Sequence, residues 1–70
     1  MDHEAIGERI RRARLRRSYG QADLAREAGL AKATLWLIEH GRQQPRPATV
    51  RKIAAVLGID VEELTSPEAR

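Results

Sequence analysis

The side chains with the clearest chemical capacity in this sequence are basic, and they are grouped along the chain. Residues 1–20 contain six arginines against three acidic residues, and residues 41–59 contain four basic residues and no acidic one. Residues 60–70 contain four acidic residues and a single arginine. Clustered guanidinium and ammonium groups bind the phosphates of nucleic acids. Arginines can also simply be solvated side chains on exposed helix faces, and composition alone leaves both interpretations open.

Side chains that could support catalysis are few. His3 lies in the N-terminal segment and His40 at the end of a predicted helix, and the sequence has no cysteine and no glycine-rich phosphate loop. Glu39 has a simpler explanation, because it can pair with Arg14, a charge on the apolar stripe of its helix that would be costly to bury alone. We therefore expect a protein that is not an enzyme and that needs neither a cofactor nor a metal ion.

The stretch from Gln21 to Glu39 would form the structure that positions the basic side chains. It predicts two short helices, at about residues 21–28 and 32–40, with Gly29 between them. Apolar residues recur at helical spacing on both sides of that glycine, at Leu24, Ala25, Ala28, Leu30, Leu35 and Ile38. Glycine suits the end of the first helix because the left-handed conformation there costs it no Cβ clash. Two such helices form a helix-turn-helix, whose second helix can enter a DNA major groove, and this favours the phosphate-binding interpretation of the arginines.

Three further helices are predicted around this motif. They cover residues 4–17, residues 48–57 with Pro47 in the first turn, and residues 61–65 with Asp60 as N-cap. The loop that follows the motif carries two prolines and no evident apolar anchor. No segment has the pattern of a strand. The sequence therefore predicts an all-α fold, a compact five-helix bundle.

The length of 70 residues predicts one small domain over residues 1–70. Residues 66–70 are expected to form a frayed tail. The N-terminus lacks the apolar core of a signal peptide, and no run approaches the ~18 apolar residues of a membrane span. The absence of cysteine suits a reducing compartment, so we expect a cytoplasmic protein associated with the nucleoid.

Several segments together resemble a known family, the phage repressor and Cro-type (XRE-like) helix-turn-helix domain. They are QADLAREAGL at residues 21–30, IEHG at residues 38–41 and TVRKIAAVLGI at residues 49–59. The similarity covers about residues 5–65. It implies a lambda-repressor-like bundle that binds double-stranded DNA as a repressor-like transcription regulator, usually as a dimer on a palindromic operator.

Matched position by position, the resemblance implies that two parts of the motif contact DNA. Gln21 corresponds to the glutamine at the start of the first motif helix, which contacts the DNA backbone and an outer base. Lys32, Ala33 and Leu37 occupy the positions through which the second motif helix contacts bases.

The resemblance also implies phosphate contacts and a structural pair. His40 and Arg42 fall where the family contacts phosphate near the end of the second motif helix, and Arg46 lies in the basic loop that follows. Arg14 and Glu39 match a buried ion pair that links the first helix to the end of the motif, in agreement with the cost of burying Arg14 alone.

Some residues depart from the family pattern. Ala31 replaces the usual Ser or Thr N-cap and so removes a hydroxyl that could contact phosphate. Ala33 and Leu37 offer only apolar contact, for example with a thymine methyl group. Lys32 can donate to guanine or contact a phosphate, and both remain open. Thr34 is better explained as a packing residue than as a base contact.

Trp36 has three interpretations, because helical geometry sets it about 100° from Leu35 and away from the core stripe. Its indole can lie along the DNA backbone, or it can fold over a neighbouring helix. Together with Leu37 it can also form an exposed apolar pair that binds another protein. The third interpretation supports an alternative function, a protein-interaction module of antirepressor or antitoxin type with weak or no specific DNA readout. The intact Gln21 and the basic loop argue against that alternative.

The last apolar residues bear on oligomeric state. Ile59, Val61 and Leu64 can close the core of the monomer or leave a small apolar patch near the C-terminus. A patch there would serve a twofold contact, so the sequence predicts a homodimer through this region.

Overall fold

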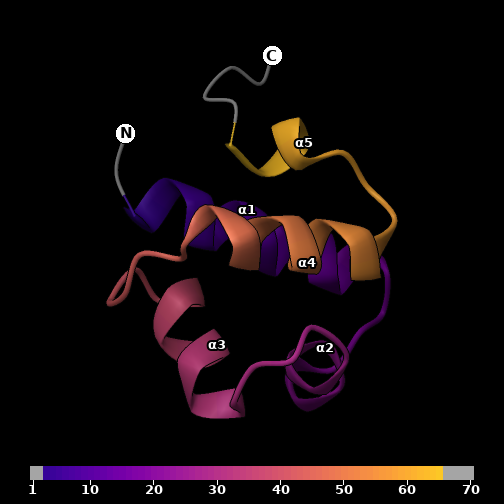
Figure 1. Ribbon diagram of the computed structural model, residues 1–70, viewed down its shortest axis with the longest axis horizontal. Coiled ribbons are helices and arrows are strands. Elements are labelled where there is room, and N and C mark those ends of the chain that lie inside the picture. The colour runs from indigo at the N-terminus through magenta and orange to yellow at the C-terminus, as the bar shows by residue number, and fades with distance from the viewer. Residues whose placement is uncertain (1–2, 66–70) are drawn as a thin grey trace.

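The computed structural model describes the backbone of residues 3–65 and the side chains of residues 6–65. Five helices follow one another in this part of the chain (Figure 1), namely α1 (His3–Arg16), α2 (Gln21–Glu27), α3 (Lys32–Glu39), α4 (Pro47–Leu57) and α5 (Val61–Thr65). Residues 3–65 contain no strand. The all-α prediction is therefore confirmed, with helix boundaries close to the predicted ones. The predicted tail, residues 66–70, lies outside the described residues.

The helices pack around one core. In Figure 1, α4 lies across α1 in the middle of the molecule, α2 and α3 lie below them, and α5 lies above. Helix α1 contacts α3, α4 and α5, and α2 contacts α3 and α4. The largest fully buried side chains come from every helix: Ile10, Leu24, Leu35, Ile38, Ile53, Leu57 and Leu64. Within residues 3–65, none of the helices combines the length and the apolar character needed to cross a bilayer.

The turn between α2 and α3 has the predicted form. Gly29 has a φ of 75°, in the left-handed region. The N–H of Leu30 donates to the carbonyl of Ala25 at 2.7 Å, which closes the end of α2 with the hydrogen bond of a Schellman motif. Leu30 is half-buried against the core. The turn therefore fixes where α3 begins.

Two details of the fold differ from the sequence-based expectations. Pro45 is buried, so the loop between α3 and α4 does have an apolar anchor. Leu64 is 1% exposed and belongs to the core cluster. Leu64 thus closes the monomer core, and the part of the dimer hypothesis that placed it on a surface patch is wrong. Proline burial in a loop depends on what packs over it, which the local sequence does not show.

Helix α1 passes very close to the end of α3 at Gly7. A Cβ atom added at Gly7 would collide with the carbonyl oxygen of Ile38 and would lie 3.0 Å from that of Glu39. Both obstacles are backbone atoms, so neither can rotate away. The approach of α1 to α3 therefore requires glycine at this position.

We predict that Gly7→Ala destabilises the domain by about 1–2 kcal/mol. Overpacking typically costs about 1–3 kcal/mol, and the better helix propensity of alanine recovers up to about 1 kcal/mol. Urea unfolding followed by circular dichroism measures the change. A variant more stable than the wild type would show that only helix propensity matters there, and would contradict the close approach.

Candidate nucleic-acid interface

The predicted pair of Arg14 and Glu39 is present, and it joins α1 to the last residue of α3. The Nε of Arg14 donates to Oε2 of Glu39 at 2.7 Å, and Nη2 donates to Oε1 at 3.0 Å. The third donor, Nη1, binds the carbonyl of Tyr19 at 2.9 Å. The two side chains are only 11% and 1% exposed. This two-point geometry satisfies both charges inside the protein and fixes their orientation.

Gln21 extends this network to the first residue of α2. Its Nε2 donates to Oε1 of Glu39 at 3.1 Å, and the residue is half-buried. Glu39 therefore accepts hydrogen bonds from α1 and α2 at once. The residue predicted to contact DNA at the start of α2 is held in place by the same carboxylate that holds α1 against α3.

The first turn of α3 presents small apolar side chains and one ammonium group. Ala31 is the N-cap, with φ −71° and ψ 146°, and no side chain caps the helix. Lys32 and Ala33 are exposed, while Thr34 is half-buried. Helix α3 therefore begins without the hydroxyl that the family pattern provides, and Lys32 is the charged group of its exposed first turn.

Trp36 and His40 form a stacked pair on the exposed side of α3. Their ring centroids are 3.8 Å apart and their planes differ by 16°. Nδ1 of His40 also lies 2.9 Å from the backbone carbonyl oxygen of Trp36. Trp36 is 43% exposed, whereas Leu37 is half-buried. The sequence interpretations of Trp36 did not include this partner, although the spacing of four residues was the signal that could have revealed it.

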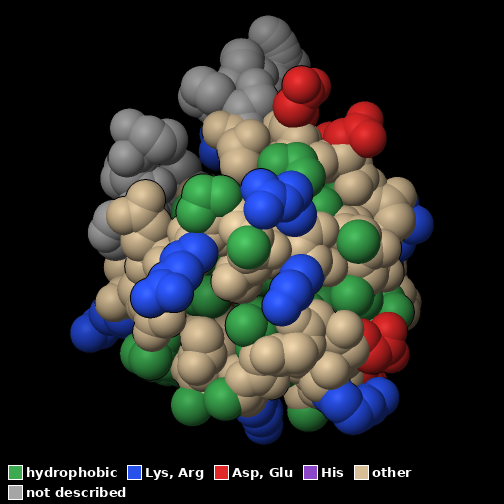
Figure 2. All heavy atoms as spheres, viewed as in Figure 1, with side chains coloured by type: hydrophobic (Ala, Val, Ile, Leu, Met, Phe, Trp, Pro, Cys, Tyr) green, Lys and Arg blue, Asp and Glu red, His purple; other side chains and the backbone are tan. Residues whose placement is uncertain are grey.

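Basic side chains follow directly after α3. Arg42 and Arg46 are both exposed, and the N–H of Arg42 donates to the carbonyl of Leu37 at 2.8 Å. Arg46 precedes α4 as its N-cap. Figure 2 shows Lys and Arg side chains over the face on which α4 lies, and acidic side chains near α5 and at the edge beside α2. The charge asymmetry of the sequence is thus an asymmetry of the surface.

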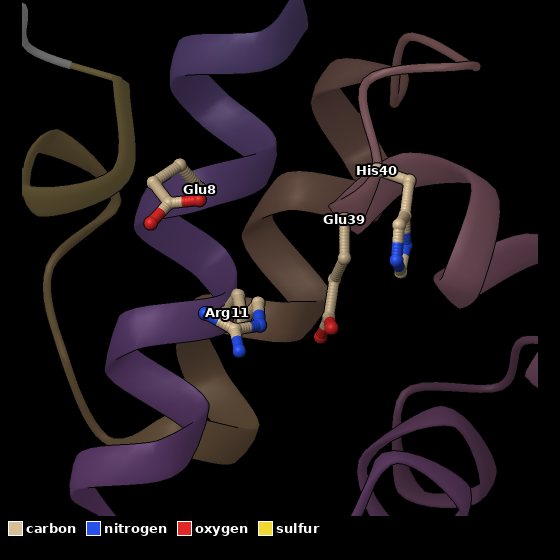
Figure 3. Close-up of a pocket in the computed structure, with 4 residues that line it drawn as sticks. All are labelled: Glu8, Arg11, Glu39 and His40. Carbon is tan, nitrogen blue, oxygen red and sulfur yellow. The ribbon is translucent and has the colours of Figure 1, made fainter.

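A hollow of about 410 Å³ lies between α1 and the end of α3. Its lining residues are Glu8 and Arg11 from α1, and Glu39 and His40 from the end of α3 (Figure 3). Glu8 forms an exposed ion pair with Arg12 at 3.3 Å. The hollow therefore brings charged groups of α1 close to the imidazole of His40.

Two further side chains complete the description of this surface, Leu15, to which sequence reasoning gave no position, and Tyr19, whose ring it expected inward with the hydroxyl at the rim. Leu15 is 51% exposed on the outer side of α1. The hydroxyl of Tyr19 donates to Oε1 of Glu27 at 2.9 Å, and this hydrogen bond raises the pKa of the Tyr19 hydroxyl above its usual value. Both residues lie outside the network around Glu39, apart from the backbone carbonyl of Tyr19.

Comparisons with known proteins agree with this architecture. A family model described as "Helix-turn-helix domain" matches residues 5–66. YazB of Bacillus subtilis, an uncharacterized HTH-type transcriptional regulator, is 37% identical over 68 residues, which cover 97% of this chain and 99% of YazB. The immunity repressor protein of Bacillus phage phi105 is 35% identical over 63 residues, which cover 90% of this chain and 44% of the repressor.

Solved structures of SinR are also similar. The N-terminal DNA-binding domain of SinR from Bacillus subtilis has 34% identity and a TM-score of 0.86, covering 96% of this chain and 99% of that domain. A structure of SinR in complex with DNA has 38% identity and a TM-score of 0.80, covering 84% of this chain and 95% of that one. The chain belongs to the helix-turn-helix family of the phage repressor and Cro type.

We predict that Glu39→Gln lowers the free energy of unfolding by about 3 kcal/mol. Removing one partner of a buried ion pair leaves the other charge buried without compensation. Chemical denaturation measures the loss. The control is Glu8→Gln, which removes an exposed ion pair and should cost less than about 1 kcal/mol. Equal losses in the two variants would contradict the structural role of Glu39.

Proposed function

We propose that this domain is a sequence-specific, repressor-like transcription regulator that places α3 in the major groove of double-stranded DNA, without catalysis. The observation that supports it most is the exposed face of α3, with Gln21 held against Glu39 at the last residue of the helix and the exposed Arg42 just beyond it, in a fold similar to that of SinR in complex with DNA. Such a regulator acts on the chromosome, which would place the protein with the nucleoid in the cytoplasm.

Phosphate contacts supply most of the affinity in this proposal. Gln21, His40, Arg42 and Arg46 border α3 and its following loop, and all but the half-buried Gln21 are exposed. Contacts to phosphate fix the register of the protein on the duplex and make binding depend on salt. Glu39 orients Gln21 for this task through the hydrogen bond at 3.1 Å.

Base recognition rests on few polar groups. Lys32 can donate to the major-groove edge of guanine, while Ala31, Ala33, Trp36 and Leu37 offer apolar surface. Apolar side chains in the major groove contact the C5 methyl group of thymine. Because direct donors are scarce, DNA shape and deformability would supply part of the specificity.

The domain would bind as a homodimer on a palindromic operator, with the two α3 helices about 34 Å apart. Leu64 is buried and does not take part, but Ile59 and Val61 are half-buried near the C-terminal end of the described chain. A mostly apolar hollow of about 430 Å³ adjoins Val61 and is also lined by Ile6, Pro47 and Val50. We propose that Ile59, Val61 and this hollow form the twofold contact.

A protein-interaction module remains the second candidate, because Trp36 is 43% exposed. Leu37 is half-buried, so the exposed apolar surface of the Trp36 and Leu37 pair, on which that candidate depends, is reduced.

Selection from a pool of random duplexes, followed by sequencing at low and moderate salt, tests the main proposal. An enriched palindrome is the expected result. Binding that is insensitive to salt, or equal on all sequences, would contradict it and favour the protein-interaction module.

We predict that the double variant Arg42→Ala/Arg46→Ala binds its operator at least about tenfold more weakly at moderate salt. Each lost phosphate contact should reduce the slope of log K against log[salt] by about 0.9, so the double variant should lose nearly 2. Fluorescence anisotropy over a salt series measures both quantities. Lys52→Ala, an exposed charge in the middle of α4, is the control and should keep the wild-type slope.

We predict that replacing thymine by uracil under α3 weakens binding although base pairing is unchanged. Loss of one buried methyl contact, at about 0.8 kcal/mol, corresponds to about a fourfold rise in Kd. Competition with operators carrying uracil at single positions measures the effect. Uracil in flanking DNA serves as the control, and equal affinity for all the duplexes would contradict readout by the apolar face.

A further inference from the structure

The geometry of the Trp36–His40 pair determines which nitrogen of His40 carries a proton. Nδ1 of His40 lies 2.9 Å from the carbonyl oxygen of Trp36. A carbonyl oxygen can only accept a hydrogen bond, so Nδ1 must be the donor. In a neutral imidazole one nitrogen is a donor and the other an acceptor. Neutral His40 therefore has an unprotonated Nε2.

Unprotonated Nε2 is the wrong partner for DNA phosphate. The side chain of His40 is exposed, and Nε2 is the ring nitrogen left for an outside partner. Phosphate oxygens are acceptors, and so is a bare Nε2, so neutral His40 cannot bind phosphate through this atom. In the imidazolium form both nitrogens are donors, and Nε2–H can bind a phosphate with the help of a full positive charge.

We infer that His40 binds a DNA phosphate only as the imidazolium, so that DNA binding by this domain takes up a proton. The inference rests on the proposed function and adds a linkage between pH and affinity to it. Trp36 is a positioning residue in this scheme, because its ring and its carbonyl fix the imidazole. A cation over the face of an indole is attracted to it, so the stack persists when His40 is protonated.

The charged neighbours of His40 do not replace the phosphate as a partner. Glu39 is occupied by Arg14 and Gln21, and Glu8 is paired with Arg12. Arg11, which lines the same hollow, is itself a cation and has no acceptor to offer a positively charged His40. A phosphate brought in by DNA favours that charge. DNA binding therefore favours the protonated form of His40.

The test measures Kd for the operator from pH 6 to pH 8.5 at constant ionic strength. The wild type should bind more tightly as pH falls, by up to about tenfold per pH unit, which is the limit for one proton. His40→Gln, whose side chain does not change charge over this range, should lose this dependence and should bind more weakly than the wild type at pH 6. The control is His3→Gln, which changes the other histidine of the chain and should keep the wild-type slope.

Three results would overturn the inference. An equal pH slope in the wild type and in His40→Gln would show that His40 takes up no proton, while the proposed function would stand. Long-range ¹H–¹⁵N spectra of the free protein at pH 8 report the tautomer directly, and Nε2–H instead of the expected Nδ1–H would remove the premise. Absence of DNA binding at every pH and salt concentration would refute both the inference and the proposed function.

Discussion

The structure depends on one buried ion pair, between Arg14 of α1 and Glu39 at the end of α3. The carboxylate also accepts from Gln21 of α2, and the guanidinium also donates to the carbonyl of Tyr19. Three helices and a turn thus meet at two side chains. Two buried charges are costly unless they are paired and hydrogen-bonded, and here four hydrogen bonds join them to each other, to Tyr19 and to Gln21. Because Gly7 lets α1 approach the same end of α3, the orientation of α3 is fixed from two sides.

In this arrangement one side of α3 packs inside the protein and the other side is exposed to a partner. One side of the helix carries Leu35, Ile38 and Glu39 and is buried. The other side carries exposed Lys32, Ala33 and Trp36. In the proposed complex, charges around the helix supply affinity, while methyl contacts and DNA shape supply discrimination. A recognition helix with so few donors relies on accurate placement, since apolar contacts act only at short range.

Sequence reasoning predicted the parts of this structure that depend on local pattern or on the cost of burying a charge. Helical spacing indicated four of the helices, and the N-cap at Asp60 indicated the fifth. The cost of burying Arg14 alone in an apolar stripe indicated its pairing with Glu39. The left-handed turn at Gly29 followed from the chemistry of glycine. The details that it missed depend on how helices dock. The burial of Pro45 and the contact at Gly7 are set by how the helices pack, which one sequence does not specify. The spacing of Trp36 and His40 permits a contact on one helix face, but the stack also depends on their side-chain rotamers. The DNA contacts carried over from the family remain predictions.

The central claim is that the exposed side of α3, together with Gln21 and residues 40–46 beside it, forms the DNA-binding surface. Amide chemical-shift mapping during titration with a selected operator tests it most directly. The account predicts that the largest shifts fall on Gln21, on residues 31–37 and on residues 40–46, and that α5 shifts only through the proposed contact between two copies. Shifts concentrated on the outer side of α1 around Leu15, with α3 unchanged, would contradict the account.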